Sequence, residues 1–463
     1  MTVEQLYTNC LSEAAYFIES NGEAAVIDPL RDYQAYIDLA AKKGVAIKYI
    51  FETHFHADFV SGHIDLSNKT GASIIYGPEA ITGYPVTVAT NNQRFKVGNI
   101  EIEALHTPGH TPESTCYLLW DENKAPYCLF TGDTLFVGDV GRPDLFGTVL
   151  TKEEMAAHMF ESLKIIKSLP DEVLVYPAHG PGSACGKNIG KETWSTIGNQ
   201  KKLNYALQDL SIDEFIKTVT IGLSKPTQYF PLNAKINKEG YSPLDEVLFR
   251  SRKPLSIAEF EKAKQNGSAV IDTRHENEFE QGFVPGSVFI GLHGRFAEWV
   301  GTLIRIDEPV LLITETGKEE ETILRMARVG YEHVIGYLDG GFEAWKNAGK
   351  TFDMVISIDA EEFKLDYLHD EITVVDVRKE SEYESGHVSG AYNVVLQQFD
   401  EQISKVEGHQ KDTYVYCQGG YRSMIAVSLL KRRGNHQLRN ISGGWQTISK
   451  TDIPVEIPKF SVS

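Results

Sequence analysis

Short apolar runs recur along the first half of the chain, and loops rich in His, Asp, Gly and Pro follow them. Apolar runs bounded by turn-forming residues predict β-strands. The runs are AAVID (24–28), YIFE (49–52), ASIIYG (72–77), IEIEAL (100–105), TCYLLW (115–120), YCLFT (127–131) and EVLVYP (172–177). Because polar residues gather where strands give way to loops, we expect a functional site along one edge of the sheets.

The pattern changes after residue 190. Residues 190–240 have mostly helical periodicity, as in KKLNYALQDLSIDEFIKTVTIGL (201–223). The stretch SPLDEVLFRSRKPLS, which begins at residue 242, is interpreted as a connector, with a domain boundary at about residue 245.

The second half of the chain repeats itself. Residues 269–287, AVIDTRHENEFEQGFVPGS, match residues 373–391, TVVDVRKESEYESGHVSGA. Asp272, Arg274, Glu278, Gly282 and Gly286 recur as Asp376, Arg378, Glu382, Gly386 and Gly390. GGFEAW (340–345) recurs as GGWQTI (443–448). The repeat predicts two tandem copies of one domain of about a hundred residues.

Each copy alternates strand and helix signals. A short apolar strand ends in Asp-x-Arg, an acidic helix follows, and later an apolar strand precedes a helical run such as MIAVSLLKRRG (424–434). This alternation predicts an α/β fold with a parallel sheet covered on both faces. We therefore expect three domains, at residues 1–245, 246–355 and 356–463.

Length and net charge indicate how many domains the chain has and which partners are excluded. A chain of 463 residues is too long for one core and suggests about two to four domains. With 42% hydrophobic and 24% charged residues, the composition is that of a globular protein. The formal net charge of −19, from 64 acidic and 45 basic residues, argues against nucleic acid as a partner.

Cysteine usage and hydropathy point to a reducing compartment. The first residues lack the basic and apolar regions of a secretory signal, and no apolar run approaches the length of a membrane span. The five cysteines are odd in number and widely scattered, which argues against a disulfide framework. We expect a cytoplasmic protein with no membrane partner, in which any important thiol is reactive rather than structural.

Four loops of the first half contain potential metal ligands. They are THFHADF (53–59), HTPGHTPES (106–114), the loop that begins TGDTLFVGDVGRP at residue 131, and YPAHGPGSACGK (176–187). Imidazole and carboxylate groups are natural ligands of zinc or iron. Any one of these histidines could be an ordinary surface residue, but four such loops together predict a metal site.

The order HxHxD, TPGHT, GD and PAHG over residues 1–190 resembles the metallo-β-lactamase superfamily. The resemblance implies an αβ/βα sandwich. In the binuclear hydrolases of that superfamily, one metal is held at the positions of His54, His56, His110 and Asp133, and the second at those of Asp58, Phe59, His179 and Asp133. Phenylalanine cannot ligate a metal, so the second site is expected to be broken.

Within that superfamily, the sequence resembles the persulfide dioxygenase branch. The resemblance implies one Fe(II) per chain, held by His54, His110 and Asp133, with zinc possible in the protein as purified. Two histidines and one carboxylate form the facial triad of non-haem iron oxygenases, which leaves positions open for substrate and O₂. His56 and Asp58 then become supporting groups that orient ligands by hydrogen bonds, and His179 either does the same or lines the substrate pocket.

Three further residues of this half are candidates for substrate chemistry. Arg142 and Tyr176 resemble residues that line the substrate pocket in persulfide dioxygenases, where a guanidinium can bind a carboxylate and a phenol can donate a hydrogen bond. Cys185 follows His179 in a Gly- and Ser-rich loop and is expected near the metal. It could relay a sulfane sulfur or be a small buried hydrophobic residue.

The tandem copies resemble rhodanese domains, most clearly in DVRKESEYESGHVSGAYN (376–393). The second copy continues VYCQGGYRS (415–423), in which Cys417 is the expected sulfur carrier. Backbone N–H groups, the following helix and Arg422 should favour the thiolate. Gln418, Gly419, Gly420 and Tyr421 are expected to cradle the bound sulfur.

The corresponding stretch of the first copy, residues 311–330, contains no cysteine and is acidic. An acidic loop would repel an anionic sulfur donor. We expect this copy to be an inactive rhodanese that serves as a spacer or an interface.

The resemblances together imply that a low-molecular-weight thiol persulfide is oxidised by O₂ to sulfite and thiol. Cys417 would then transfer a sulfane sulfur to sulfite, which gives thiosulfate. The alternatives are a mononuclear zinc thioester hydrolase with an appended sulfurtransferase, and a scaffold that only binds partners. The sequence leaves open the thiol carrier, the metal as isolated and the oligomeric state, although a homo-oligomer is possible.

Overall fold

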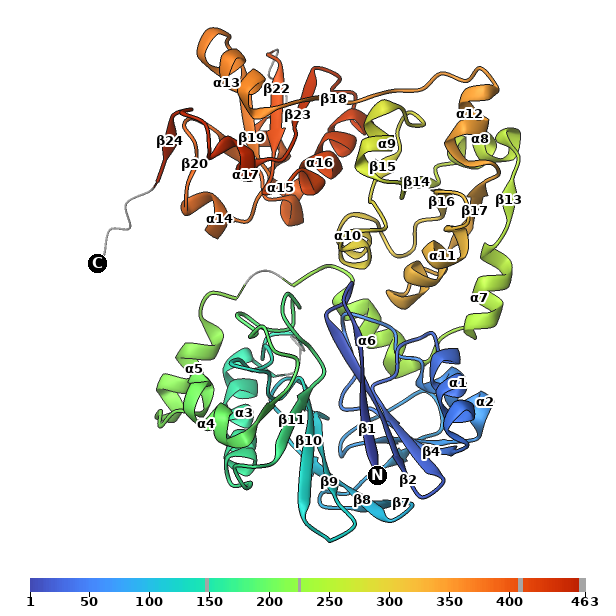
Figure 1. The fold of residues 1–463 in the computed structure, drawn as a ribbon, viewed down its shortest axis with the longest axis vertical. Helices are drawn as coiled ribbons and strands as arrows, with labels where there is room; N and C mark the ends of the chain where they lie inside the picture. Colours follow the sequence, from blue (N-terminus) through green and yellow to red (C-terminus); the bar gives the residue numbers. More distant parts are fainter. Residues whose placement is uncertain (146–149, 224–225, 407–410, 458–463) are drawn as a thin grey trace. The chain divides into compact units, whose positions relative to one another are not determined.

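The computed structural model describes residues 1–145, 150–223, 226–406 and 411–457. Its contacts divide the chain into two units (Figure 1). Unit 1 contains Met1–Val247 and Leu324–Glu332, and unit 2 contains Leu248–Ile323 and His333–Ser463. The fold class expected from the sequence is confirmed, because unit 1 contains a two-sheet sandwich and unit 2 contains two parallel α/β sheets.

The first sheet of the sandwich mixes antiparallel and parallel pairs. Its strand order is β1-β2-β3-β4-β5-β6, with β1 to β3 antiparallel and β3 to β6 parallel. The strands are β1 (Thr2–Thr8), β2 (Glu13–Ser20), β3 (Glu23–Ile27), β4 (Ala46–Phe51), β5 (Ser73–Tyr76) and β6 (Thr87–Val88). The runs AAVID, YIFE and ASIIYG fall on β3, β4 and β5.

The second sheet is mostly antiparallel, in the order β12-β11-β10-β9-β8-β7, with one parallel pair between β10 and β11. Its strands are β7 (Arg94–Val97), β8 (Ile100–His106), β9 (Thr115–Trp120), β10 (Pro126–Gly132), β11 (Leu174–Pro177) and β12 (Ser195–Thr196). Every strand predicted from an apolar run of this half is present.

Apolar side chains from both sheets form the central core. Tyr16, Ile27, Phe51, Tyr117 and Phe130 belong to one buried cluster, in which alternate residues of each strand face the other sheet. A second cluster lies between the outer face of the second sheet and the helices that cover it, including Met159 and Phe215.

Helices α1 (Gln34–Lys43) and α2 (His63–Thr70) lie against the first sheet, and α3 (Lys152–Lys167), α4 (Ile197–Leu203), η1 (Tyr205–Leu207) and α5 (Ile212–Thr220) cover the second (Figure 1). Two further helices, α6 (Phe230–Glu239) and α7 (Leu244–Ser251), follow in the chain. The stretch interpreted as a connector is therefore partly helical. Helix α7 starts directly after Pro243 with Asp245 and Glu246 in its first turn, and both features favour a helix start.

The first copy of the repeat has a parallel sheet in the order β13-β17-β16-β14-β15. Its elements are β13 (Pro254–Leu255), α8 (Ile257–Gln265), β14 (Ala269–Asp272), α9 (Glu276–Gln281), β15 (Val288–Phe289), α10 (Phe296–Leu303), β16 (Val310–Ile313), α11 (Glu319–Arg328), β17 (Val334–Leu338) and α12 (Gly341–Asn347).

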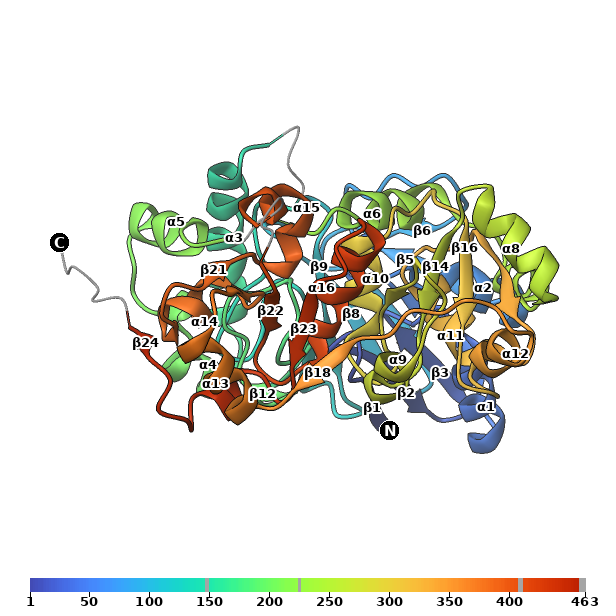
Figure 2. The same cartoon turned by 90° about the horizontal axis from the view of Figure 1, so that it is seen from above.

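The second copy has the corresponding order β18-β23-β22-β19-β21, again parallel (Figure 2). A small β20–β24 pair lies beside it (Figure 1). Its elements are β18 (Ile356–Ile358), α13 (Ala360–His369), β19 (Thr373–Asp376), α14 (Glu380–Glu384), β20 (His387–Val388), β21 (Tyr392–Asn393), η2 (Leu396–Gln398), α15 (Phe399–Gln402), η3 (Ile403–Lys405), β22 (Thr413–Tyr416), α16 (Tyr421–Arg432), β23 (Leu438–Ile441), α17 (Trp445–Ile448) and β24 (Val455–Glu456).

The repeated Asp-x-Arg motif has the same structure in both copies. The Arg274 guanidinium forms a bidentate pair with Asp272 and donates one hydrogen bond to the carbonyl of Gly282 (2.8 Å). Arg378 bonds in the same way to Asp376 and to the carbonyl of its own glycine, at 2.7 Å. A bidentate buried pair fixes the turn after the first long strand, which explains why the spacing recurs.

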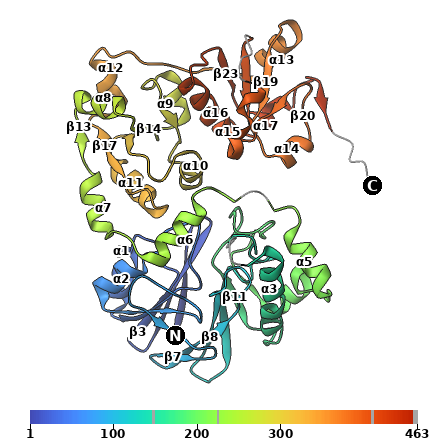
Figure 3. The same cartoon turned by 180° about the vertical axis from the view of Figure 1, so that it is seen from behind.

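The two copies contact each other inside unit 2. Helix α16 of the second copy lies beside β15 of the first, and Figure 3 shows α16 next to α9 of the first copy. The Phe289 amide donates to the Ser428 hydroxyl at 2.9 Å, and the Tyr421 hydroxyl donates to the Gly291 carbonyl at 2.8 Å. Within the described ranges, no helix has the length and apolar character needed to cross a membrane.

Candidate functional site

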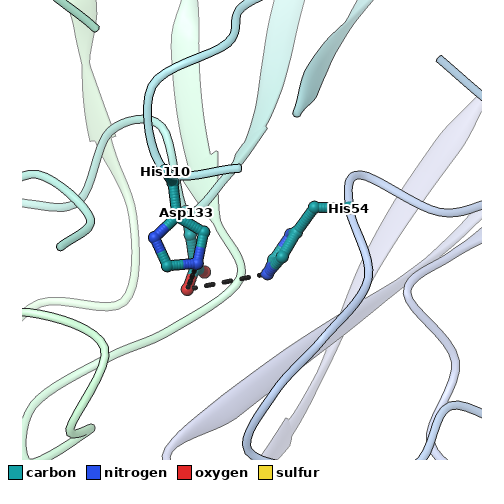
Figure 4. Close-up of side chains that lie close together, drawn as sticks. All are labelled: His54, His110 and Asp133. Carbon is teal, nitrogen blue, oxygen red and sulfur yellow. Dashed lines mark ion pairs between the residues drawn. The ribbon is translucent and has the colours of Figure 1, made fainter. Parts of the chain in front are cut away.

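Three side chains from separate loops converge at one edge of the sandwich (Figure 4). His54 lies beyond β4, His110 between β8 and β9, and Asp133 directly after β10. The Asp133 Oδ2 atom is 3.8 Å from His54 Nε2 and 3.4 Å from His110 Nε2. Each residue is at most 2% exposed. The structure thus brings together the three ligands predicted from the sequence.

Hydrogen bonds at the far nitrogens fix both imidazoles for metal binding. His110 Nδ1 donates to the Arg142 carbonyl at 2.9 Å. The Thr53 hydroxyl donates to Asp28 at 2.8 Å and therefore accepts from His54 Nδ1, at 2.9 Å. With a proton on each Nδ1, each Nε2 carries a lone pair that faces Asp133.

The residues present fit a metal ion. Neither carboxylate oxygen of buried Asp133 accepts a hydrogen bond, which is costly unless a cation compensates the charge. Burial, followed by the neighbouring His56, His110 and His179, lowers the pKa of His54 well below its usual value, so this imidazole is neutral and able to ligate. Donor atoms that share a tetrahedral ion lie about 3.4 Å apart, close to the spacing seen here.

Close packing of the backbone supports the triad. A Cβ atom on Gly141 would lie 2.1 Å from the Asp133 carbonyl and 2.9 Å from His110 Nδ1. Only glycine at position 141 lets the backbone approach Asp133 and His110 so closely.

His56 lies beside two buried carboxylates. Its Nε2 atom is 3.1 Å from Asp28 and 3.7 Å from Glu52. Burial opposes its protonation, but Asp28 and the other nearby carboxylates outweigh burial and raise the pKa of His56 to about 10. The fully buried ring of Phe59 packs against the His56 ring with a centroid distance of 4.4 Å. An imidazole held in this way supports the loop at residues 53–61, which carries His54 and is called the ligand loop below.

His179, Asp58 and Cys185 form a second group beside Asp133. His179 Nε2 is 3.4 Å from Asp58 and 3.5 Å from Asp133. The donor atoms of Asp133, His179 and Cys185 all lie within 4.8 Å of one another, as do those of His56, Asp58 and His179. Burial, then the charges of Asp58 and Asp133, raises the pKa of the Cys185 thiol well above its usual value. The expected position of Cys185 near the metal ligands therefore agrees with this geometry.

The two expected substrate-binding residues differ in their surroundings. Arg142 is buried, and its guanidinium forms a bidentate pair with Asp144 at 2.9 and 2.8 Å. Its amide donates to the Cys185 carbonyl at 3.0 Å, which joins the two loops. Tyr176 packs in the central apolar cluster, with its ring stacked on Phe130 at 5.7 Å.

Sequence reasoning missed two residues, Asp28 and Asn237, that hold the loop at residues 53–61. Asp28 accepts hydrogen bonds from both the amide and the hydroxyl of Thr53. Asn237 of α6 donates to the carbonyls of His56 and Phe59, both at 2.8 Å, and accepts from the Ser61 amide at 2.9 Å. Asp28 could have been noticed as a polar end to an apolar strand, but no local signal marks Asn237.

The candidate sulfur-transfer loop of the second copy begins where β22 ends. Cys417 is 1% exposed, and the Gly420 amide donates to its Sγ atom at 3.1 Å. Helix α16 starts at Tyr421, so its positive end faces the loop. Gln418 accepts from the Gln446 amide at 3.1 Å, while a Cβ on Gly419 would meet no atom nearer than 3.9 Å.

Arg422 forms a bidentate pair with Glu382, with both bonds at 2.7 Å. Burial lowers the pKa of Arg422, but Glu382 and then the nearby Cys417 outweigh it, so the net shift is upward. The repeated GGW segment supports the loop from below, because the Trp445 amide donates to the Cys417 carbonyl at 2.7 Å. Gly444 has a φ of 52°, and a Cβ there would lie 2.3 Å from that carbonyl oxygen.

Strands β16 and β22 occupy equivalent positions in the two copies and end at Ile313 and Tyr416. The next residue is Thr314 in the first copy and Cys417 in the second. A threonine cannot form a persulfide.

Comparison with known proteins agrees with this architecture. Residues 8–179 match the family described as Metallo-beta-lactamase superfamily. Residues 256–348 and 359–451 each match the Rhodanese-like domain. A solved structure named as a metallo-beta-lactamase from Staphylococcus aureus is 32% identical, with a TM-score of 0.65, and the match covers 73% of this chain and 98% of that one. This chain belongs to the metallo-beta-lactamase superfamily. Its metallo-beta-lactamase domain is followed by two rhodanese domains.

Other members of the superfamily match only parts of this chain. ETHE1 from Myxococcus xanthus is 28% identical with a TM-score of 0.43, over 51% of this chain and 100% of that one. A probable hydroxyacylglutathione hydrolase from Schizosaccharomyces pombe is 36% identical over 140 residues, which are 30% of this chain and 50% of the relative. The chain spans about half the length of that curated relative.

Proposed function

We propose that this member of the superfamily oxidises a low-molecular-weight thiol persulfide with O₂ and transfers sulfane sulfur through Cys417. The observation that carries the proposal is the surroundings of Phe59. Its apolar ring is fully buried against His56, which is itself directed at Asp28, so two imidazoles and one carboxylate remain as the three-ligand set. That set matches the facial triad of non-haem iron oxygenases.

The residues of the chain have separate roles in this proposal. His54, His110 and Asp133 would hold one Fe(II), which when bound supplies a centre where the persulfide and O₂ react. Thr53 and the Arg142 carbonyl hold the imidazoles in the ligating tautomer. Burial of all three ligands excludes bulk water from the reacting groups.

The overall oxidation is balanced as RSSH + O₂ + H₂O giving RSH + H₂SO₃. The terminal sulfur is oxidised, O₂ is reduced, and the S–S bond is broken. The donor atoms of Cys185, Asp133 and His179 lie within 4.8 Å of one another, which supports a contact between Cys185 and the sulfur substrate in this proposal.

Sulfur transfer needs no further oxidant. The Cys417 thiolate attacks the outer sulfur of a second persulfide, RSS⁻, which gives Cys417–S–S⁻ and releases RS⁻. Sulfite then attacks the outer sulfur of Cys417–S–S⁻, which gives thiosulfate and regenerates the thiolate. The Gly420 amide and the start of α16 would stabilise the negative charge on each of these sulfur species.

Two variants separate the two reactions. Cys417→Ser should leave O₂ uptake on glutathione persulfide unchanged, while sulfite accumulates in place of thiosulfate. Cys10→Ser removes another thiol and should behave as the unaltered protein. Unchanged thiosulfate formation by Cys417→Ser would contradict the sulfur-transfer role.

The metal assignment has its own test. Anaerobically purified protein should contain about one iron per chain and consume O₂ with glutathione persulfide. His54→Ala should lose both properties, whereas His158→Ala, which changes an exposed histidine of α3, should keep them. Iron retention and full O₂ uptake in His54→Ala would refute the ligand set.

A zinc-dependent thioester hydrolase is the second candidate. The similarity to a probable hydroxyacylglutathione hydrolase supports it, and so does the group of His56, Asp58 and His179, whose donor atoms lie within 4.8 Å of one another. This candidate predicts bound zinc, hydrolysis of a glutathione thioester and no O₂ uptake. The metal content and the oxygen electrode together distinguish the two.

A further inference from the structure

A cluster of metal-ligating side chains lies outside both sites, in the cysteine-less rhodanese copy. His275 and Glu276 stand at the start of α9, and His293 lies in the loop between β15 and α10. Their donor atoms all lie within 4.8 Å of one another. The proposed persulfide chemistry uses none of these three residues.

The spacing of the donor atoms suits one ion. Glu276 Oε2 is 2.8 Å from His293 Nε2 and 3.3 Å from His275 Nδ1. Ligands at about 2.0–2.1 Å from an ion lie about 2.9–3.4 Å from one another, depending on the geometry. The two imidazole rings stack nearly parallel, with centroids 4.5 Å apart and an interplanar angle of 16°, and Glu276 Oε2 lies beside one nitrogen of each ring.

Few other bonds compete with coordination. Glu276 Oε2 is withdrawn from solvent and makes no hydrogen bond of normal geometry. His275 Nδ1 is unprotonated, because it accepts a long hydrogen bond from the Asn277 amide at 3.3 Å, and its lone pair must leave that bond to bind an ion. The imidazoles themselves are 45% and 41% exposed, which gives an ion access from solvent.

The second copy provides an internal comparison. Shifted by the repeat, the three positions are Lys379, Glu380 and Gln397, although the two sheets keep the same strand register. A lysine and a glutamine do not replace a pair of imidazole ligands. The rhodanese fold therefore does not require the two histidines, and their convergence in the first copy calls for a separate explanation.

We propose that His275, Glu276 and His293 form a binding site for a divalent transition-metal ion in the cysteine-less rhodanese domain. Two imidazoles with one carboxylate favour zinc, nickel or copper over magnesium or calcium, which prefer oxygen ligands. A fourth position faces solvent and would take water or an external ligand.

The site adjoins the sulfur-transfer loop. The ring of Tyr421 meets His293 edge-on with a centroid distance of 5.4 Å, and its hydroxyl donates to the Gly291 carbonyl. A Cβ on Gly294 would lie 2.3 Å from the Tyr421 ring, so glycine is needed for this contact. An ion at His293 would therefore sit next to the residue that opens α16. This location gives the cysteine-less domain a chemical role beside the active copy.

Zinc titration of the full-length, untagged chain tests the proposal. His54→Ala and His110→Ala are combined first, so that zinc binding at the triad does not obscure the result. Calorimetry on this background, with and without His293→Ala, should show that the added change removes one equivalent of Zn²⁺ per chain. Equal stoichiometry in the two proteins would overturn the proposal.

Two further variants guard against a loss caused by misfolding. His369→Ala, which changes an exposed histidine at the end of α13, should keep the full stoichiometry on the same background. His293→Cys keeps a ligand and should retain the ion, and Co²⁺ should then produce a new thiolate-to-cobalt absorption band that the His293 parent lacks. Absence of that new band would also contradict the assignment.

Discussion

The hydroxyl of Thr53 offers the sharpest test of how the metal centre is built. It accepts from His54 Nδ1 at 2.9 Å and donates to Asp28 at 2.8 Å. Thr53→Val keeps the shape of the side chain but removes both bonds. The amide of residue 53 still donates to Asp28 at 2.7 Å, so the loop should keep its position. The change therefore isolates the control of the His54 tautomer.

The expected effect follows from the loss of a group that orients a ligand. Such losses reduce metal affinity by about 10–100-fold. That reduction equals about 1.4–2.8 kcal/mol of binding free energy. One Asp28 oxygen also loses its donor while buried, which should lower the free energy of unfolding by about 1–3 kcal/mol.

The assay is anaerobic competition for Fe²⁺ between the protein and a coloured chelator. Thr53→Ser retains the hydroxyl, so its affinity should stay within about twofold of the unaltered protein, well below the 10–100-fold loss expected for Thr53→Val. Thr220→Val removes a buried hydroxyl from α5, where it bonds only to the helix backbone, and should leave affinity unchanged. If Thr53→Val bound Fe²⁺ as tightly as Thr53→Ser, the tautomer argument would be wrong.

Three further predictions concern other parts of the chain. Gly444→Ala places a Cβ against the Cys417 carbonyl and should shift the loop that carries this thiol, so the rate of thiosulfate formation should fall at least about tenfold. The rate of O₂ uptake should stay unchanged and serves as the control. Asn237→Leu leaves three buried backbone groups of the ligand loop without a hydrogen-bond partner, so the free energy of unfolding in urea should fall by at least about 2 kcal/mol. A smaller fall would contradict the anchoring role of Asn237. Burial raises the pKa of Asp65 to about 6, despite the opposing effect of nearby Arg31. The folded state then binds more protons than the unfolded state, so stability should fall as pH rises from about 4 to about 6, by about 1–3 kcal/mol. Asp65→Asn should remove this fall, and an unchanged pH profile would refute the assignment.

Sequence reasoning predicted the fold because the signals were local and repeated. Apolar runs such as YIFE and TCYLLW are bounded by turn residues, and each became a strand. The two copies could be aligned because Asp-x-Arg and its distant glycine form one hydrogen-bonded unit in each. The strands at residues 2–20 were not recognised, although they form one edge of the first sheet.

The candidate ligands were also accessible from sequence, since His54, His110 and Asp133 stand in short motifs at strand ends. What the motifs could not give was orientation. The structure alone shows that His56 is directed toward Asp28 and that Thr53 holds His54. Hydrogen bonds between segments far apart in sequence decide these orientations.

From the sequence alone, the architecture could be predicted and the candidate metal ligands and Cys417 could be singled out, because periodicity and motif spacing are properties of neighbouring residues. Tertiary structure decided which groups support them. Asn237 reaches back 181 residues to the His56 carbonyl, and His293 meets Glu276 only after β15 pairs with β14. Such contacts depend on how strands and helices pack in three dimensions, and one-dimensional patterns do not encode them.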